Sequence, residues 1–267
     1  MFDAAKAVGM TTIGLQHGTI HEMHFSYRFT QEEMEAHRPV PDHMLTWGEH
    51  WVRSLREHGN YPASTLHLTG QPRADIIPVL KGLEKTDVLP WLDETKPLIS
   101  FATQMFRTDE LRKKGAEAVL EFAQQHPEIQ VVFKLHPREK DLSFYQSLID
   151  QYGCKNVRQE PAVDLYSLLA ISDALITISS TVGAEAIYFH LPLVVLDLWE
   201  EDSMGYIESG IGLAARNGEE LGQVISDVLA GNRSLNQEQY DRYIRDFGYK
   251  IDGKAGERIV QFIKGTD

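Results

Sequence analysis

The chain is poor in the features that mark secreted, membrane-spanning and nucleic-acid-binding proteins. Its one cysteine, Cys154, excludes an intramolecular disulfide and suits a reducing compartment. No uncharged apolar run approaches the roughly 18 residues that a membrane-spanning helix needs. Basic residues are scarce, since 26 Lys and Arg stand against 39 Asp and Glu, and the net charge of -13 argues against a nucleic-acid partner.

The first ten residues, MFDAAKAVGM, lack the basic start and the long apolar core of a signal peptide. We therefore expect a cytoplasmic protein, and the alternative is a peripheral position at the inner face of the membrane. The 267 residues, of which 42% are hydrophobic, suffice for one large or two medium globular domains.

Short apolar runs alternate with amphipathic segments, which predicts an α/β fold built on parallel, Rossmann-like sheets. We expect residues 1–80 to be the last part of an N-terminal unit, 81–96 to be a linker, and 97–267 to be a complete C-terminal nucleotide-binding domain with a terminal helix. The chain starts on what reads as the tail of a helix. We therefore expect an upstream half of the first sheet, or a partner chain, to complete it.

The main candidate site lies in the stretch from Asp164 to Leu198, which reads as a helix, a buried strand, a turn, a second helix and a second strand. The turn contains Ser179, Ser180 and Thr181, where the strand ends and the second helix begins. Unpaired N–H groups and the positive end of the helix dipole favour an anion at such a place. We interpret this turn as the phosphate cradle of a nucleotide-diphosphate site.

Two further residues of the second helix belong to the same prediction. Gly183 would let the first turn of the helix approach a ligand closely. Glu185, about one turn into the helix, would face the same ligand site. The alternative is that Ser179 or Ser180 merely caps the helix, as is common in α/β proteins.

Histidines supply the other candidates. His17 precedes Gly18 at the end of a predicted strand, where an imidazole could act as a general base; a solvent-exposed loop histidine is the alternative. His21 and His24 are one residue too close for the HExxH zinc pattern, so we expect no metal site.

His136 also follows a strand and could donate a hydrogen bond to a phosphate, with Lys134 or Arg138 adding charge. The alternative for His136 is a structural cap of the next helix. Arg73, after a Gly-Gln-Pro corner, could reach an anion or form a surface salt bridge.

Five short motifs together resemble GT-B glycosyltransferases, and within them the CDP-glycerol glycerophosphotransferase and surface-polysaccharide transferase group. They are Gln16-His17-Gly18-Thr19, Gly70-Gln71-Pro72-Arg73, Lys134-Leu135-His136-Pro137, Asp164-Leu165 with Ser172-Asp173 through Ser180, and Asp252-Gly253-Lys254 with Glu257-Arg258-Ile259. The last motif and the Ser-Thr-x-Gly-x-Glu turn are also similar to hydrolysing UDP-N-acetylglucosamine 2-epimerases. The chain departs from the transferase pattern at Gln16, Thr177 and Ile178.

The resemblance implies roles for individual residues. It makes His17 the catalytic base, and it places the donor pyrophosphate on His136, Ser179 and Ser180. The similarity to the 2-epimerases implies that Glu185 binds the ribose hydroxyls.

The expected activity is transfer of a glycosyl or alditol-phosphate group from a CDP- or UDP-linked donor to a hydroxyl of a polymer or lipid-linked acceptor. We expect no cofactor and no metal. The loop 159–163 is expected to read the nucleobase. One alternative is a UDP-N-acetylglucosamine 2-epimerase, for which only Glu22 and Glu49 offer acidic groups in the first unit. Another is a nucleotide-binding half without activity of its own.

Overall fold

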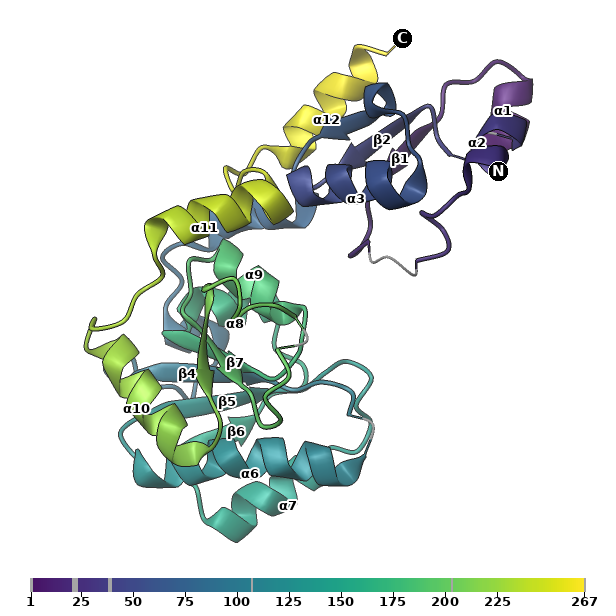
Figure 1. Ribbon diagram of the computed structural model, residues 1–267. Coiled ribbons are helices and arrows are strands. Elements are labelled where there is room, and N and C mark those ends of the chain that lie inside the picture. Colours follow the sequence, from purple (N-terminus) through teal and green to yellow (C-terminus); the bar gives the residue numbers. More distant parts are fainter. Residues whose placement is uncertain (1, 21–23, 38–39, 107, 203, 267) are drawn as a thin grey trace. The chain divides into compact units, whose positions relative to one another are not determined.

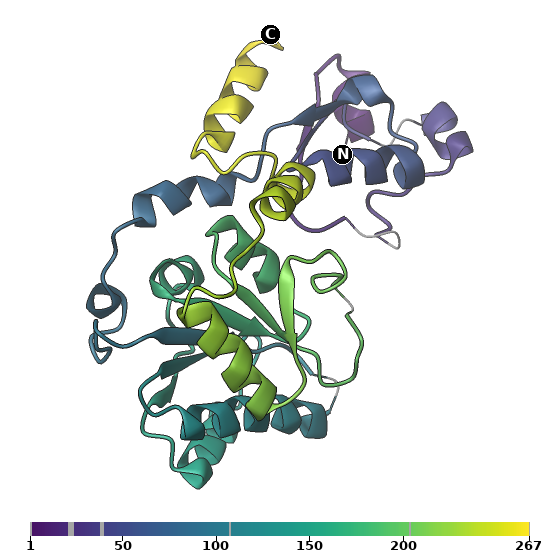
Figure 2. The same ribbon diagram turned by 60° about the vertical axis from the view of Figure 1, so that its left-hand side comes forward.

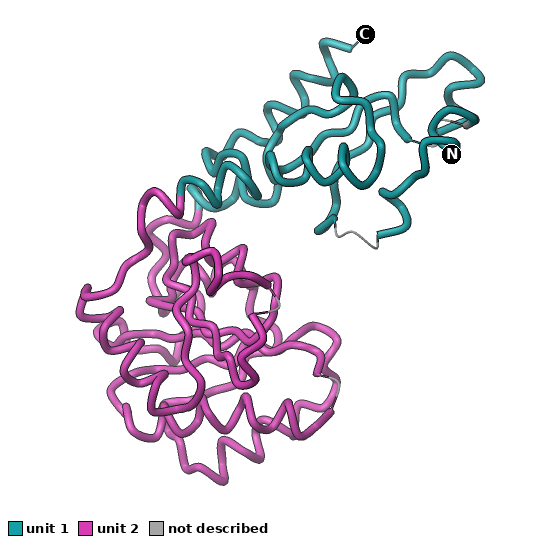
Figure 3. The backbone as a smooth tube through the Cα atoms, in the orientation of Figure 1, with its two compact units in different colours: residues 1–79, 241–267 teal, residues 80–240 magenta. Residues whose placement is uncertain are grey.

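The computed structural model describes residues 2–20, 24–37, 40–106, 108–202 and 204–266. These residues form two compact units, which Figure 3 shows in different colours. Unit 1 combines residues 1–79 with 241–267, and unit 2 contains residues 80–240. In this described part of the chain, no helix has both the length and the apolar character that a membrane span requires.

Unit 1 contains a three-stranded parallel sheet in the order β1-β2-β3. Trp51 and Leu55, on one face of helix α3, are buried beside Met44 of strand β2 and form the core of the unit. The elements of unit 1 are α1 (Phe2–Ala7), β1 (Ile13–Leu15), α2 (Gln31–His37), β2 (His43–Thr46), α3 (Glu49–Gly59), η1 (Ala63–Thr65), β3 (Leu66–Leu68), η2 (Pro72–Ile76), η3 (Ile244–Gly248) and α12 (Ala255–Lys264), with α4 (Ile77–Leu80) and α11 (Gln237–Tyr243) at its boundaries.

Unit 2 contains a parallel sheet of six strands in the order β6-β5-β4-β7-β8-β9, and helices cover both of its faces (Figure 1). Figures 1 and 2 show α6, α7 and α10 on one face and α8 and α9 on the other. Strands β4, β7 and β8 are buried along their whole length, as apolar strands covered on both faces should be. The elements are α5 (Lys85–Val88), β4 (Leu98–Ala102), α6 (Asp109–Gln125), β5 (Gln130–Lys134), α7 (Ser143–Tyr152), β6 (Val157–Gln159), α8 (Leu165–Ile171), β7 (Ala174–Thr177), α9 (Val182–Tyr188), β8 (Leu193–Leu196), β9 (Gly212–Ala215) and α10 (Gly218–Leu229).

Residues 241–267 belong to unit 1, whereas the sequence predicted that they belong to the C-terminal domain. The physical reason is a polar junction. The Asp75 carboxylate accepts hydrogen bonds from the N–H groups of Ala255 (2.8 Å) and Gly256 (2.7 Å) at the start of α12. Arg258 donates to the Thr69 carbonyl at 2.7 Å. The Gly-Gln-Pro-Arg and Asp-Gly-Lys motifs therefore meet in one structural junction.

The segment 81–96, expected to be a linker, belongs to unit 2. Two of its apolar side chains, Leu89 and Leu92, are buried in a small core with β4 and α8. Leu83, Val88 and Trp91 are partly buried against that core. Pro90 and the charged residues of this segment therefore mark the surface of unit 2, not a domain connection.

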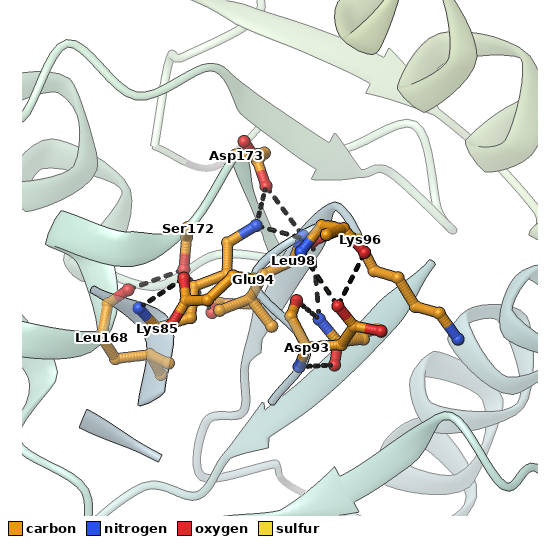
Figure 4. Close-up of polar contacts among 11 residues, drawn as sticks. Lys85, Asp93, Glu94, Lys96, Leu98, Leu168, Ser172 and Asp173 are labelled. Atoms are coloured by element: carbon orange, nitrogen blue, oxygen red, sulfur yellow. Dashed lines mark hydrogen bonds and ion pairs between the residues drawn. The ribbon is translucent and has the colours of Figure 1, made fainter. Parts of the chain in front are cut away.

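The Ser172-Asp173 motif lies at the amino end of β4, shown in Figure 4. Asp173 accepts a hydrogen bond from the Leu98 N–H at 2.7 Å and pairs with the Lys85 ammonium at 3.2 Å. The Ser172 hydroxyl donates to the Leu168 carbonyl at 2.7 Å. This motif thus fixes α5, α8 and β4 to one another and lies at the sheet edge opposite the predicted site.

Candidate functional site

Three neighbouring strands of unit 2 end beside the predicted site residues. Gln104 follows β4, His136 follows β5, and Ser179 follows β7. In the sheet order β5-β4-β7 these parallel strands are adjacent, so their carboxyl ends lie at one edge. The structure therefore brings the predicted phosphate ligands of both loops to the same edge, where open α/β sheets bind their ligands.

The turn after β7 is tied to the end of β4 by a reciprocal pair of hydrogen bonds. The Ser179 N–H donates to Gln104 Oε1 at 2.8 Å, and Gln104 Nε2 donates to the Ser179 hydroxyl at 2.7 Å. The Ser180 hydroxyl accepts from the Val182 N–H at 3.3 Å within the turn, while the N-cap residue of α9, Thr181, makes no side-chain capping bond. Neither Ser179 nor Ser180 is therefore the N-cap residue that the alternative prediction named, and Thr181 is exposed.

Gly183 differs from its predicted surroundings because it is buried under a side chain of the same unit. A Cβ atom at this position would lie 2.7 Å from the ring of Tyr206, which is 2% exposed. The Tyr206 hydroxyl accepts from the Ala184 N–H and donates to the Ser180 carbonyl, both at 3.1 Å. The space next to Gly183 therefore serves packing of Tyr206 and not the close approach of a ligand.

The His136 imidazole has a defined hydrogen-bond partner. Its Nδ1 accepts from the Arg138 backbone N–H at 3.2 Å, and the residue is half-buried. A neutral imidazole with Nδ1 as acceptor carries its proton on Nε2. His136 can therefore present an Nε2–H donor, as its predicted role requires.

The predicted accessory residues of unit 2 have different environments. Lys134 donates to the Pro161 carbonyl at 2.9 Å, and burial lowers the pKa of its ammonium group. Arg138 is exposed. Glu185, on α9, accepts a hydrogen bond from the Tyr166 hydroxyl of α8 at 3.3 Å. Lys134 thus supports the loop 159–163, and Glu185 is bonded to the facing helix.

His17 lies in unit 1, two residues beyond β1. It is exposed, and its Nδ1 lies 3.0 Å from the Tyr27 hydroxyl. Burial raises the pKa of Tyr27, so this phenol stays protonated and can donate to the imidazole. Arg73, also in unit 1, is the second residue of η2 and is exposed.

The alternatives that needed acidic groups or a metal rest on side chains of unit 1. His21 and Glu22 lie outside the described residues. Glu49 is in surface ion pairs with Arg53 (3.8 Å) and Arg245 (3.9 Å). Within the described ranges, no three His, Cys, Asp or Glu residues are grouped as metal ligands.

Sequence reasoning missed three side chains at this edge: Gln104, Thr103 and Tyr206. Gln104 and Thr103 directly follow a predicted strand, a position that could have marked them. Tyr206 contacts the turn after β7 from 26 residues away, measured from Ser180, and no local pattern indicates it.

Comparisons with known proteins identify the family and the fold. A family model described as UDP-N-acetylglucosamine 2-epimerase matches residues 38–264. A search of curated proteins found no match.

Solved structures extend the likeness. The UDP-GlcNAc 2-epimerase of Neisseria meningitidis, bound to UDP-GlcNAc, is 16% identical with a TM-score of 0.67, over 98% of this chain and 71% of that one. The wall teichoic acid polymerase TagF is 17% identical with a TM-score of 0.64, over 96% and 68%. The UDP-GlcNAc 2-epimerase of Methanocaldococcus jannaschii, in complex with UDP-GlcNAc and UDP, is 18% identical with a TM-score of 0.60, over 84% and 61%. These structures confirm the predicted fold class, α/β with parallel Rossmann-like sheets of GT-B type.

Proposed function

Because this chain belongs to the UDP-N-acetylglucosamine 2-epimerase family, we propose that it is an enzyme that acts on a nucleoside diphosphate sugar, with a UDP-linked amino sugar as the first candidate. One observation carries the proposal: Gln104, His136 and Ser179 gather at the carboxyl ends of three adjacent strands. This is the edge at which open α/β sheets bind nucleotides.

In this proposal the diphosphate is bound by His136 and by the turn after β7. His136 supplies its Nε2–H, and Ser179, Ser180 and Thr181 supply hydroxyl donors. Arg138 adds positive charge from the exposed side of its loop. Glu185, whose carboxylate only accepts hydrogen bonds, suits the hydroxyl groups of a ribose.

The chemistry that these groups support is cleavage of the bond between the sugar and the diphosphate. Negative charge develops on the phosphate oxygen that leaves, and fixed hydrogen-bond donors stabilise that charge. A missing donor of this type costs on the order of 3 kcal/mol in the transition state. We propose that these donors act without a metal ion.

A second candidate is transfer of the sugar or alditol phosphate to an acceptor hydroxyl. The observation that favours it is His17, which lies just after a parallel strand and is oriented by Tyr27. His17 would deprotonate the acceptor. The likeness to TagF supports the fold that such a reaction uses. A third possibility, binding without turnover, follows if neither reaction is found.

The first test is a thermal-shift panel of UDP, UDP-N-acetylglucosamine, CDP, CDP-glycerol and GDP. A ligand that binds only the native state raises the melting temperature by mass action, so the panel identifies the base. We expect UDP compounds to stabilise the wild type and His136→Ala to lose most of that effect. His126→Ala is the matched control, because His126 lies between α6 and β5, at the amino end of β5 and thus at the opposite edge of the sheet. An unchanged response in His136→Ala would overturn the assigned site.

The second test separates the reactions. The protein is incubated with UDP-N-acetylglucosamine, and free N-acetylmannosamine and UDP are measured. A parallel reaction with CDP-glycerol and a glycerol-phosphate acceptor measures transfer. Release of N-acetylmannosamine supports the first candidate. Transfer that His17→Asn abolishes supports the second.

A further inference from the structure

The turn that carries His136 is held by a buried polar side chain from the neighbouring strand. Thr103 follows β4 and is 2% exposed. Its hydroxyl accepts a hydrogen bond from the His136 backbone N–H at 2.9 Å and donates to Glu139 Oε2 at 2.5 Å. One hydroxyl therefore links the end of β4 to both ends of the turn after β5.

Glu139 fixes the direction of these bonds. Its side chain is 5% exposed and pairs with the Arg112 guanidinium of α6 at 3.2 Å. Its Oε1 also accepts from the Tyr145 hydroxyl of α7 at 2.8 Å. An ionised carboxylate only accepts hydrogen bonds, so the Thr103 proton must point to Glu139, and its lone pairs remain for the His136 N–H.

The turn is also closed by its own contacts. Pro137 occupies the second position, where its fixed φ suits a turn, and the Glu139 N–H donates to the His136 carbonyl at 2.9 Å. The Arg138 N–H, held by the same turn, donates to His136 Nδ1. The position of the imidazole and the nitrogen that carries its proton are therefore both determined by the turn that Thr103 and Glu139 anchor.

We propose that Thr103 and Glu139 are positioning residues that hold His136 as an Nε2–H donor toward the diphosphate. This inference rests on the proposed function. It assigns a role to a buried Thr-Glu-Arg-Tyr network that touches no ligand itself. The network acts only through His136, and this is the property that separates it from ordinary support of the fold.

A double-mutant cycle tests that property. UDP affinity is measured by calorimetry for the wild type, Thr103→Val, His136→Ala and the double variant. Loss of one oriented hydrogen bond predicts an increase in Kd of about three- to tenfold for Thr103→Val. In the His136→Ala background the same change should alter Kd by less than about twofold. Thr103→Ser, which keeps the hydroxyl, should restore wild-type affinity.

One further measurement keeps the test decisive if Thr103→Val folds poorly. Nitrogen-15 NMR of the imidazoles should show the Nε2–H form of His136 in the wild type and a mixture of tautomers in Glu139→Gln. A wild-type His136 protonated on Nδ1 would overturn the inference. So would equal losses of affinity from Thr103→Val in both backgrounds. Absence of UDP binding by the wild type would instead overturn the proposed function, and with it the inference.

Discussion

Replacing Gly183 by alanine separates two explanations of why this glycine stands at the start of α9. If the glycine lets a phosphate approach, alanine should weaken nucleotide binding and leave stability unchanged. If it makes room for Tyr206, alanine should destabilise unit 2. The geometry favours the second explanation, because the new Cβ would lie 2.7, 2.9 and 3.1 Å from three atoms of the Tyr206 side chain.

The size of the effect follows from those distances. Ordinary contacts between carbon atoms lie near 3.5–4.0 Å, so the ring must move by several tenths of an ångström. Tyr206 is 2% exposed, and its hydroxyl holds the Ala184 N–H and the Ser180 carbonyl, so the ring has little room. Overpacking of this kind costs about 1–3 kcal/mol, and the better helix propensity of alanine offsets up to about 1 kcal/mol. We expect a net loss of about 1–2 kcal/mol.

Thermal and urea unfolding measure this loss, which corresponds to a decrease in Tm of roughly 2–8 °C for a domain of this size. Tyr206→Leu provides the control, because it removes the ring that alanine would strike. Gly183→Ala should cost little more in the Tyr206→Leu background, so the coupling energy should be about 1 kcal/mol or more. An unchanged Tm of Gly183→Ala, together with a tenfold weaker affinity for UDP, would refute the packing explanation.

Three other predictions concern the fold around the site. Arg258→Lys should lower the stability of unit 1 by about 1–3 kcal/mol in urea unfolding, because lysine cannot reproduce the guanidinium contacts of the junction with α12. Asp173→Ala should destabilise unit 2 by a similar amount, about 1–3 kcal/mol, by leaving the Leu98 N–H without its acceptor, whereas Asp173→Asn should cost less; equal losses would contradict this. Burial, and then the neighbouring His43, lowers the pKa of His67 below its ordinary value of 6.5. The unfolded chain therefore binds a proton more readily, so stability should fall as the pH decreases below about 6.5, and His67→Gln should flatten that dependence in a pH series of unfolding curves.

The strands and helices of unit 2 were predictable because their signals are local. The first helix and the buried strand expected in the stretch from Asp164 to Leu198 are present as α8 and β7. The edge of the sheet at which His136 and Ser179 lie followed from the same pattern. Apolar runs of this length and the hydroxylated turn between them are properties of neighbouring residues, which a single sequence contains.

What the sequence could not reveal depends on partners that are far apart along the chain. The packing of α12 on unit 1 rests on Asp75, which is 180 residues from Ala255. The bonds between Gln104 and Ser179 span 75 residues. A hydroxyl or carboxylate can be recognised as polar from its letter, but its partner depends on the tertiary fold. The motifs of the C-terminal segment stand out in the sequence, yet their structural role in the junction could not be derived from spacing.

The division of unit 1 into two stretches of chain has a consequence for biosynthesis. Residues 80–240 are continuous, so unit 2 can fold as soon as it has left the ribosome, whereas unit 1 needs residues 241–267 as well as 1–79. Residues 1–79 can complete their packing only after residues 80–240 have been translated, because α12, which covers β2 and β3, is translated last. Deleting α12 should therefore destabilise residues 1–79 first, and limited proteolysis should find the earliest cleavage there.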